Sequence, residues 1–327
     1  MKQKPVITDY RWRKLRILYL ILLIIFILLI PSIVLSVYVF RRVDYLGAFT
    51  EAYPLQDIYR AKDYDLNEIV HMLNTADGES LWYSEIRAGR PSGVIIYLAA
   101  QKEPSVTYFY GHAKEMLKEG YSSFLLELRA HGKSTGSKLG LGYTEVEDVR
   151  AMVARIKEDP LYANVPIIVQ GVSLGGTVAI NSAGLIPEVD ACIAMSPFAS
   201  PDTQIDLIMK KYFIPGFLRA VEKPIIHQTL RILYSKEQAD TYTPEVQIQQ
   251  AGNKKMLIIA AAQDPVLSVE NTYRLQKIPS NAEFWIRETA DHYVIRNNDF
   301  KNVSADKDYW IYLKGFLDGV KASYKKK

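Results

Sequence analysis

At 327 residues with a formal net charge of +4, the chain is long enough for one large domain or two modest ones. Basic side chains concentrate before residue 17, at Arg41-Arg42 and in the last seven residues, so the middle of the chain is net acidic. A nucleic-acid surface needs a basic face, and an acidic body argues against nucleic acid as a partner. The single cysteine, Cys192, rules out an intrachain disulfide, and its apolar neighbours predict a buried strand residue.

Residues 17–40 form the first predicted element, a run of 24 residues without a charge. At about 1.5 Å per residue, a helix of this length crosses the ~30 Å hydrocarbon core of a bilayer. The main alternative is a cleaved signal peptide, whose apolar region has about 7–15 residues and ends at a small-residue cleavage site. The longer run and the arginines after it favour an uncleaved transmembrane helix, kinked at Pro31.

The charges that flank this helix predict its orientation. Six basic residues precede it within residues 1–16, and only Arg41 and Arg42 follow it directly. The positive-inside rule therefore places residues 1–16 in the cytoplasm and all residues after 40 on the extracytoplasmic face of the cell membrane. Residues 41–65 are predicted as a juxtamembrane connector. Residues 321–327 form a basic tail. Membrane lipid is the partner expected for the helix.

Alternating strand and helix patterns begin near residue 66. A hairpin is predicted over residues 68–86, around the Asp77-Gly78 turn. Thr144 and Glu147 have the spacing of a helix-capping box, which predicts that a helix begins there. Apolar runs typical of buried strands lie at Val94–Leu98, Ser122–Leu126, Val165–Val169, Ala191–Met195, Met256–Ala260 and Glu283–Ile286. This alternation predicts an α/β fold whose mostly parallel sheet is covered on both faces by helices.

Residues 197–252 interrupt the alternation. This stretch is apolar and helix-compatible, and we interpret it as a helical lid inserted over the strand ends. The strand–helix pattern then resumes, and an apolar stripe from Tyr309 to Val320 predicts a C-terminal helix that packs on the core. One domain over residues 66–320 accounts for the whole pattern.

Ser173 stands in the motif Gly171-Val172-Ser173-Leu174-Gly175, between an apolar run and a helix-compatible one. A serine on a sharp strand-to-helix turn has an exposed hydroxyl, and the glycines leave room for the turn. This hydroxyl becomes a nucleophile only when a base takes its proton and a carboxylate orients the base. Ser173 is therefore the candidate nucleophile, and Gly171 and Gly175 complete the turn.

The order serine, acid, histidine selects the other two catalytic candidates. Of five histidines, His71, His112 and His131 precede Ser173, and His227 lies in the predicted lid. His292 follows the last strand, where the base is expected. Asp264 follows the strand Met256–Ala260 and is the candidate acid, whereas Asp291 is too close in sequence to reach the neighbouring ring. The oxyanion of the reaction needs two backbone N–H groups, one from Leu174 and one from the loop Leu98–Gln101.

With these residues the chain resembles the α/β-hydrolases, and among them the monoacylglycerol-lipase and serine-aminopeptidase group. That group has a D-x-R-G-H-G-x-S-x-G loop, and residues 127–136 of this chain read E-L-R-A-H-G-K-S-T-G. The resemblance covers about residues 66–320 without most of the lid. It implies that this loop, including His131, is structural, and it assigns the second oxyanion donor to Gln101. The family commonly has His-Gly where this chain has Ala99-Ala100.

The predicted function is that of a membrane-anchored serine hydrolase that cleaves a small-molecule or lipid-like ester through an acyl-enzyme. Two alternatives remain open. One is an aminopeptidase-like amide hydrolase with the same triad, in which a lid carboxylate such as Asp202, Asp206 or Glu222 would bind the amino end of the substrate. The other is a catalytically silent binding protein on the same fold. No cofactor motif or metal-binding spacing occurs, so no cofactor or metal is expected.

Overall fold

A computed structural model of the protein describes residues 6–42, 60–103 and 105–325. Eight strands form one sheet in the order β1-β2-β4-β3-β5-β6-β7-β8. They are β1 (Ile69–Asn74), β2 (Ser80–Ile86), β3 (Gly93–Leu98), β4 (Tyr121–Leu126), β5 (Ile167–Val172), β6 (Ala191–Met195), β7 (Lys255–Ala261) and β8 (Ala282–Arg287). β2 pairs antiparallel with β1 and β4, and the pairs from β4 through β8 are parallel. The predicted hairpin and the six predicted strands are confirmed.

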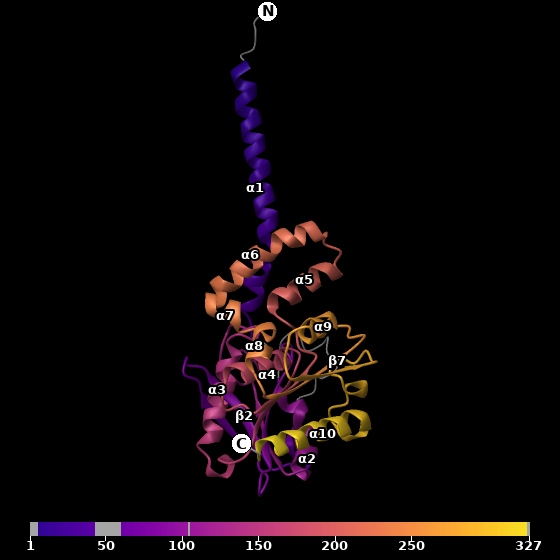
Figure 1. Ribbon diagram of the computed structural model, residues 1–327. Helices are drawn as coiled ribbons and strands as arrows, with labels where there is room; N and C mark the ends of the chain where they lie inside the picture. The colour runs from indigo at the N-terminus through magenta and orange to yellow at the C-terminus, as the bar shows by residue number, and fades with distance from the viewer. Residues whose placement is uncertain (1–5, 43–59, 104, 326–327) are drawn as a thin grey trace, which may run out of the picture.

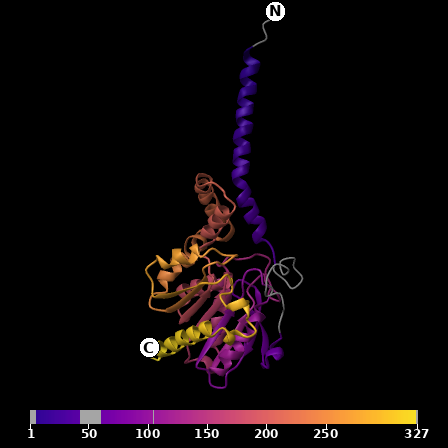
Figure 2. The same cartoon turned by 90° about the vertical axis from the view of Figure 1, so that its right-hand side faces the viewer.

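Helices cover both faces of this sheet (Figures 1 and 2). One face packs against α2 (Tyr110–Lys118) and α10 (Lys307–Tyr324). The other packs against α3 (Glu145–Lys157), α4 (Leu174–Leu185), α8 (Pro244–Gln250) and α9 (Glu270–Gln276). Side chains of β3 alternate between the two cores: Tyr97 lies in the first and Ile96 in the second. The structure is the predicted α/β-hydrolase fold.

Cys192 lies in β6, between two parallel neighbours, and is fully buried. Burial raises the pKa of its thiol to about 12, so the thiolate form is not populated near neutral pH. The prediction of a buried strand residue is confirmed, and Cys192 contributes to packing.

A helix begins at the predicted place, but the predicted capping box does not form. Thr144 already has helical backbone angles, and its side chain caps no amide. The carboxylate of Glu145 accepts hydrogen bonds from the amides of Gly140, at 2.7 Å, and Gly142, at 2.9 Å. Glu145 therefore fixes the turn that precedes α3, and the Thr144–Glu147 spacing is incidental.

The segment 197–252 is helical, as predicted. It consists of α5 (Pro201–Lys211), α6 (Gly216–Tyr234), α7 (Lys236–Thr241) and α8. α8 packs so closely on α4 that a Cβ at Gly184 would lie 2.2 Å from Oε1 of Gln247. α8 thus belongs to the body of the domain, and α5, α6 and α7 form the part that projects from it (Figure 1).

An N-terminal helix, α1 (Val6–Val39), extends away from the folded body (Figures 1 and 2). Within Trp12–Val39, an 18-residue window has a mean hydropathy of 3.2 and is 11% buried, so the length and composition of this segment suit a membrane span. The last turns of α1 contact α6: Thr229 Oγ1 donates to Ser32 Oγ at 2.9 Å, and Val39 is fully buried. The apolar helix is confirmed, whereas most of the predicted connector 41–65 and the last two residues of the tail lie outside the described residues.

Candidate active site

Ser173 sits on the turn between β5 and α4 with φ 57° and ψ −117°. This backbone conformation is strained for a residue with a Cβ, and such strain concentrates at functional sites. The turn requires the two glycines around it. A Cβ at Gly171 would lie 2.3 Å from the carbonyl of Gly175, and one at Gly175 would lie 2.4 Å from the carbonyl oxygen of Leu98. The Ser173 amide donates to the Met195 carbonyl at 2.8 Å, which fixes the turn against the end of β6.

Asp264 and His292 lie together at the carboxyl ends of β7 and β8. The Oδ2 atom of Asp264 is 2.7 Å from Nδ1 of His292, and both side chains are almost completely buried. The other carboxylate oxygen of Asp264 accepts from the amides of Val266, at 2.7 Å, and Leu267, at 2.9 Å. These amides orient the carboxylate toward the ring. A carboxylate at Nδ1 favours the tautomer with its proton there, which leaves Nε2 as an acceptor.

The end of β6 connects Ser173 to the His292 loop. Met195 accepts the Ser173 amide, and the next residue, Ser196, donates its hydroxyl to the His292 carbonyl at 2.6 Å. Within residues 6–42, 60–103 and 105–325, no hydrogen bond joins the Ser173 hydroxyl to the His292 ring. Bonds between a nucleophile and its base are often long without substrate and shorten when the substrate binds.

The two predicted oxyanion donors lie on segments that contact one another. Leu174 begins α4, and the next amide, that of Gly175, donates to the Ala99 carbonyl at 3.1 Å. Among the described residues, the amides of Leu174 and Gln101 have no hydrogen-bond acceptor. The Ala100 amide, in contrast, donates to the Tyr108 hydroxyl at 2.9 Å. The loop without glycine is therefore fixed through Ala99 and Ala100 and leaves the Gln101 N–H available.

His131 contacts this loop directly, through a contact between residues 30 positions apart that no local sequence pattern indicates. Its Nε2 atom is 2.9 Å from the Gln101 carbonyl oxygen, and its Nδ1 atom is 2.8 Å from the Arg129 carbonyl oxygen. Carbonyl oxygens only accept hydrogen bonds, so the ring nitrogen that carries the proton is the donor. His131 therefore connects the loop of residues 127–136 to the segment that carries Gln101.

Two further residues support the same region. The guanidinium of Arg42, just after α1, donates to the carbonyls of Gly132, Ser134 and Gly136 at 2.6 to 3.0 Å. The loop around His131 is thereby bonded to the exit of the N-terminal helix. Glu127, at the start of the same loop, accepts from the Lys133 amide at 2.6 Å and from the Ser105 hydroxyl at 2.8 Å.

Glu103 is a buried carboxylic acid between the Gln101 loop and the His292 loop. Its Oε1 atom accepts from the Tyr293 hydroxyl at 2.6 Å, and Tyr293 follows His292 in the chain. Burial raises the pKa of Glu103 to about 7, although the Tyr293 hydrogen bond opposes this rise. No sequence motif marks Glu103, because its role depends on a contact between residues 190 positions apart.

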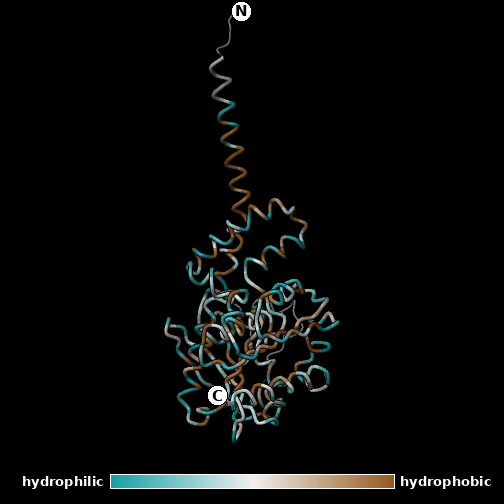
Figure 3. The backbone as a smooth tube through the Cα atoms, viewed as in Figure 1, coloured by the Kyte–Doolittle hydropathy of each residue, from teal (hydrophilic) through white to brown (hydrophobic). Residues whose placement is uncertain are grey.

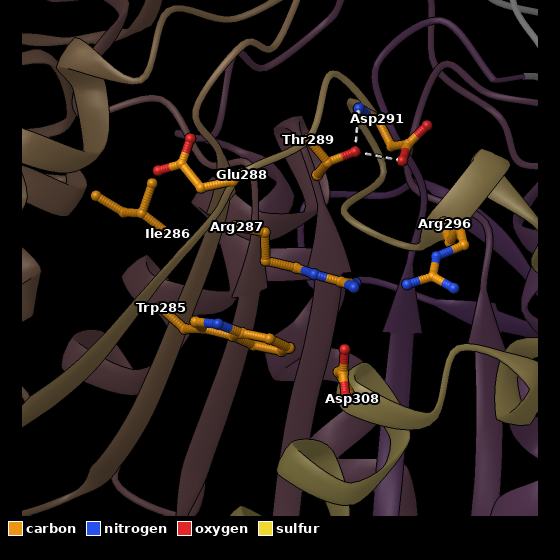
Figure 4. A pocket seen from close by; sticks show the side chains of 8 residues that line it. All are labelled: Trp285, Ile286, Arg287, Glu288, Thr289, Asp291, Arg296 and Asp308. Carbon is orange, nitrogen blue, oxygen red and sulfur yellow. Dashed lines mark hydrogen bonds between the residues drawn. The ribbon is translucent and has the colours of Figure 1, made fainter.

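A polar depression of about 450 Å³ borders the His292 loop on the outer side of β8 (Figure 4). Its wall includes Arg287, Glu288 and Arg296, and Thr289 donates a hydrogen bond to Asp291 at 2.5 Å. None of the three candidate catalytic residues lines it. Asp291 thus faces Thr289 and not His292, as expected for the rejected acid candidate.

His227 lies in the projecting helices and joins them. Its Nδ1 atom is 3.1 Å from Asp202 of α5, and its Nε2 atom is 3.0 Å from Asp240 of α7. This supports the structural role expected for His227. Within the described ranges, no group of three or more His, Cys, Asp or Glu side chains is arranged to hold a metal ion.

A family model described as "Serine aminopeptidase, S33" matches residues 89–238. Among solved structures, the esterase Pf2001 of Pyrococcus furiosus aligns at a TM-score of 0.60 and 23% identity, over 80% of this chain and 96% of the esterase. The α/β hydrolase GrgF of a Penicillium species aligns at 0.59 and 16% identity, over 79% of this chain and all of GrgF. An acylaminoacyl peptidase of Pyrococcus horikoshii aligns at 0.57 and 14% identity, over 81% of this chain and 44% of the peptidase. No curated protein matches the sequence.

Proposed function

We propose that this chain, an α/β hydrolase by fold and by its family match, is a membrane-anchored serine hydrolase that cleaves a carboxylic ester through an acyl-enzyme. The observation that carries the proposal is the 2.7 Å contact between Asp264 and His292. These residues lie in the loops after β7 and β8, where an acid and a base that follow Ser173 in the chain are expected. The strained turn at Ser173 and the esterase among the structural neighbours support the same assignment.

In the first half-reaction the Ser173 hydroxyl oxygen attacks the ester carbonyl carbon, and Nε2 of His292 takes the hydroxyl proton. Asp264 stabilises the imidazolium that forms. The amides of Leu174 and Gln101 donate to the oxyanion of the tetrahedral intermediate, where each donor contributes about 10²–10³ in rate. The intermediate collapses, the C–O bond to the alcohol breaks, and the leaving alkoxide receives the proton from His292.

The second half-reaction returns the enzyme to its starting state. Water attacks the acyl carbon of the Ser173 ester while His292 accepts a proton from the water. The second intermediate expels the Ser173 oxygen, which regains its proton from His292, and the carboxylic acid leaves. The residues named supply every proton transfer, so the proposed reaction requires no cofactor.

We further propose that α1 crosses the membrane with its N-terminus in the cytoplasm, which places the hydrolase domain on the extracytoplasmic face. Its hydropathy, exposure and flanking basic residues support this topology. Esters with acyl chains are the substrate class that suits a site below apolar helices and beside a membrane span.

A fluorophosphonate probe tests the assignment, because it forms a covalent bond to an activated serine. We expect full-length protein to be labelled and Ser173→Ala not to be labelled. Ser182→Ala is a matched control on the same helix, since the Ser182 hydroxyl is buried and has no hydrogen-bond partner among the described residues. Equal labelling of the Ser173 variant would show another nucleophile. An unlabelled native protein would favour the silent binding protein.

An amide substrate is the second candidate, and Glu222 favours it. This α6 carboxylate is 6% exposed, its Oε2 atom has no partner among the described residues, and burial raises its pKa. An unpaired buried carboxylate suits the amino group of a substrate, whereas Asp202 and Asp206 are already paired with His227 and Arg219. If the substrate is an aminoacyl amide, Glu222→Gln raises KM for that amide and leaves KM for an uncharged ester unchanged.

A further inference from the structure

The turn between α5 and α6, together with the first turns of α6, exposes a cluster of large apolar side chains, which we call the apolar tip. It consists of Tyr212, Phe213, Ile214, Phe217 and Val221, which are 72, 92, 38, 71 and 45% exposed. Isolated exposed apolar residues are common on protein surfaces, but neighbouring aromatic side chains on one projecting turn mark an interaction surface.

Apart from the buried carboxylate of Glu222 on α6, the charges around the apolar tip are positive or paired. No charged residue lies between Tyr212 and Leu218, and Lys210 and Lys211 directly precede this stretch. The nearest acidic residue on α5, Asp206, forms a 2.7 Å ion pair with Arg219 of α6. Aromatic and aliphatic side chains flanked by lysines are the composition of segments that lie in the interface of an anionic bilayer.

The apolar tip lies beside α1, the predicted membrane span. α6 is bonded to α1 through Thr229 and Ser32, and Leu35 and Tyr38 of α1 pack against the buried face of α6. From this contact α6 leads to the α5–α6 turn, which in two perpendicular views lies on the same side of the sheet as α1 (Figures 1 and 2). Hydropathy colouring shows apolar segments on both (Figure 3).

Helix length gives the depth of the bilayer along α1. Starting at Ile17, the first residue after the basic segment, a ~30 Å hydrocarbon core takes about 20 residues and ends near Ser36. Ser32, which contacts α6, lies within this interval. A bilayer positioned on the uncharged part of α1 therefore extends down to the level of α6.

We propose that the apolar tip inserts into the outer leaflet of the same bilayer that α1 crosses, as a second membrane contact of the hydrolase domain. The proposal rests on the proposed membrane topology of α1. With two contacts, the α5–α6 helices stand at the lipid surface, so an acyl ester passes from the leaflet to the Ser173 site beneath them without crossing water.

Depth-dependent quenching tests the insertion in the full-length protein. F213C carries an environment-sensitive fluorophore, and the protein is reconstituted into vesicles of phosphatidylcholine and phosphatidylglycerol that contain acyl-chain spin labels. E158C, at the exposed end of α3, is the control site. The native Cys192 is fully buried, and wild type treated in the same way measures its background. We expect quenching at position 213 to exceed that at position 158 by about two-fold or more.

Equal quenching at the two sites would overturn the proposal. Disulfide cross-linking of two unlabelled F213C chains, with no excess quenching in the labelled protein, would also overturn it, and would identify a second copy as the occupant of the apolar tip. Because quenching requires no catalysis, excess quenching in a protein without fluorophosphonate labelling supports the insertion and rejects only the hydrolase assignment.

A functional measurement uses the double variant F213D/F217D, with I311D as control, since Ile311 is 69% exposed on α10. We expect the double variant to lose about five-fold or more in rate on a long-chain ester embedded in vesicles, because two carboxylates oppose insertion. Its rate on a water-soluble short-chain ester and its probe labelling should stay within two-fold of wild type. Unchanged rates on both substrates would contradict the proposal.

Discussion

The two halves of the candidate site are built in different ways. In the acid–base half, Asp264 and His292 contact each other directly, and each follows a neighbouring parallel strand. In the oxyanion half, the amides of Leu174 and Gln101 are positioned by surrounding groups, among them His131 and Tyr108. The first half depends on a few side chains and the second on a network, so single substitutions should have larger effects in the first.

The largest effect is expected for Asp264→Asn. Its amide can present a donor to Nδ1 and favour the wrong imidazole tautomer, so we expect kcat to fall by about 10⁴. Asp291→Asn is the matched control, because Asp291 bonds to Thr289 and not to His292. Steady-state kinetics with a soluble ester measure both. If Asp291→Asn were the more damaging variant, the acid would be misassigned.

His131→Ala should have an intermediate effect. It removes the contact with the Gln101 carbonyl, and a misplaced oxyanion donor costs up to about 10²-fold in kcat, with a smaller change in KM. His71→Ala, on the edge strand β1, serves as control. A rise in KM at unchanged kcat would indicate that His131 acts on substrate binding instead.

Glu103→Gln should change stability with pH. The pKa of Glu103 is raised from 4.5 to about 7, so the folded state favours the protonated acid. This contribution to the free energy of unfolding is complete below about pH 4.5 and is lost as pH rises through 7. For a pKa shift of this size the loss amounts to at most ~3 kcal/mol. Denaturant unfolding at pH 5 and pH 8 should show wild type losing stability relative to the Gln variant. If the free energies of unfolding of the two proteins changed equally between pH 5 and pH 8, the raised pKa of Glu103 would be refuted.

The smallest effect is expected for Arg42→Ala in the full-length protein. It removes three hydrogen bonds to carbonyls of the His131 loop, and exposure to water limits their contribution to about 1 kcal/mol. We expect kcat to fall by about two- to five-fold. Arg41→Ala is the neighbouring control, because the Arg41 guanidinium lies over the Tyr38 ring. If the two variants lowered kcat equally, the effect would come from the positive charge after α1 and not from the hydrogen bonds to the His131 loop.

The comparison also shows which parts of the site the sequence predicts. Chain order and position after a strand select Ser173, Asp264 and His292, because parallel strands bring their carboxyl ends to one edge of the sheet. The contacts of His131 with Gln101 and of Glu103 with Tyr293 join residues 30 and 190 positions apart, and neither has a local pattern. The capping box predicted at Thr144 is wrong because the spacing of two residues in the sequence does not fix the orientation of their side chains.

By itself, the amino-acid sequence determined the alternation of strands and helices, the apolar N-terminal helix and the helical nature of residues 197–252. These features follow from local periodicity and hydropathy, which act over one element at a time. Only the tertiary structure decided that α8 joins the body, that α1 packs on α6, and that Tyr212–Phe217 remain exposed beside it. These features depend on which surfaces meet when distant elements pack. Apolar side chains of α6 show this: Ile226 and Leu230 are buried, whereas Phe217 is exposed.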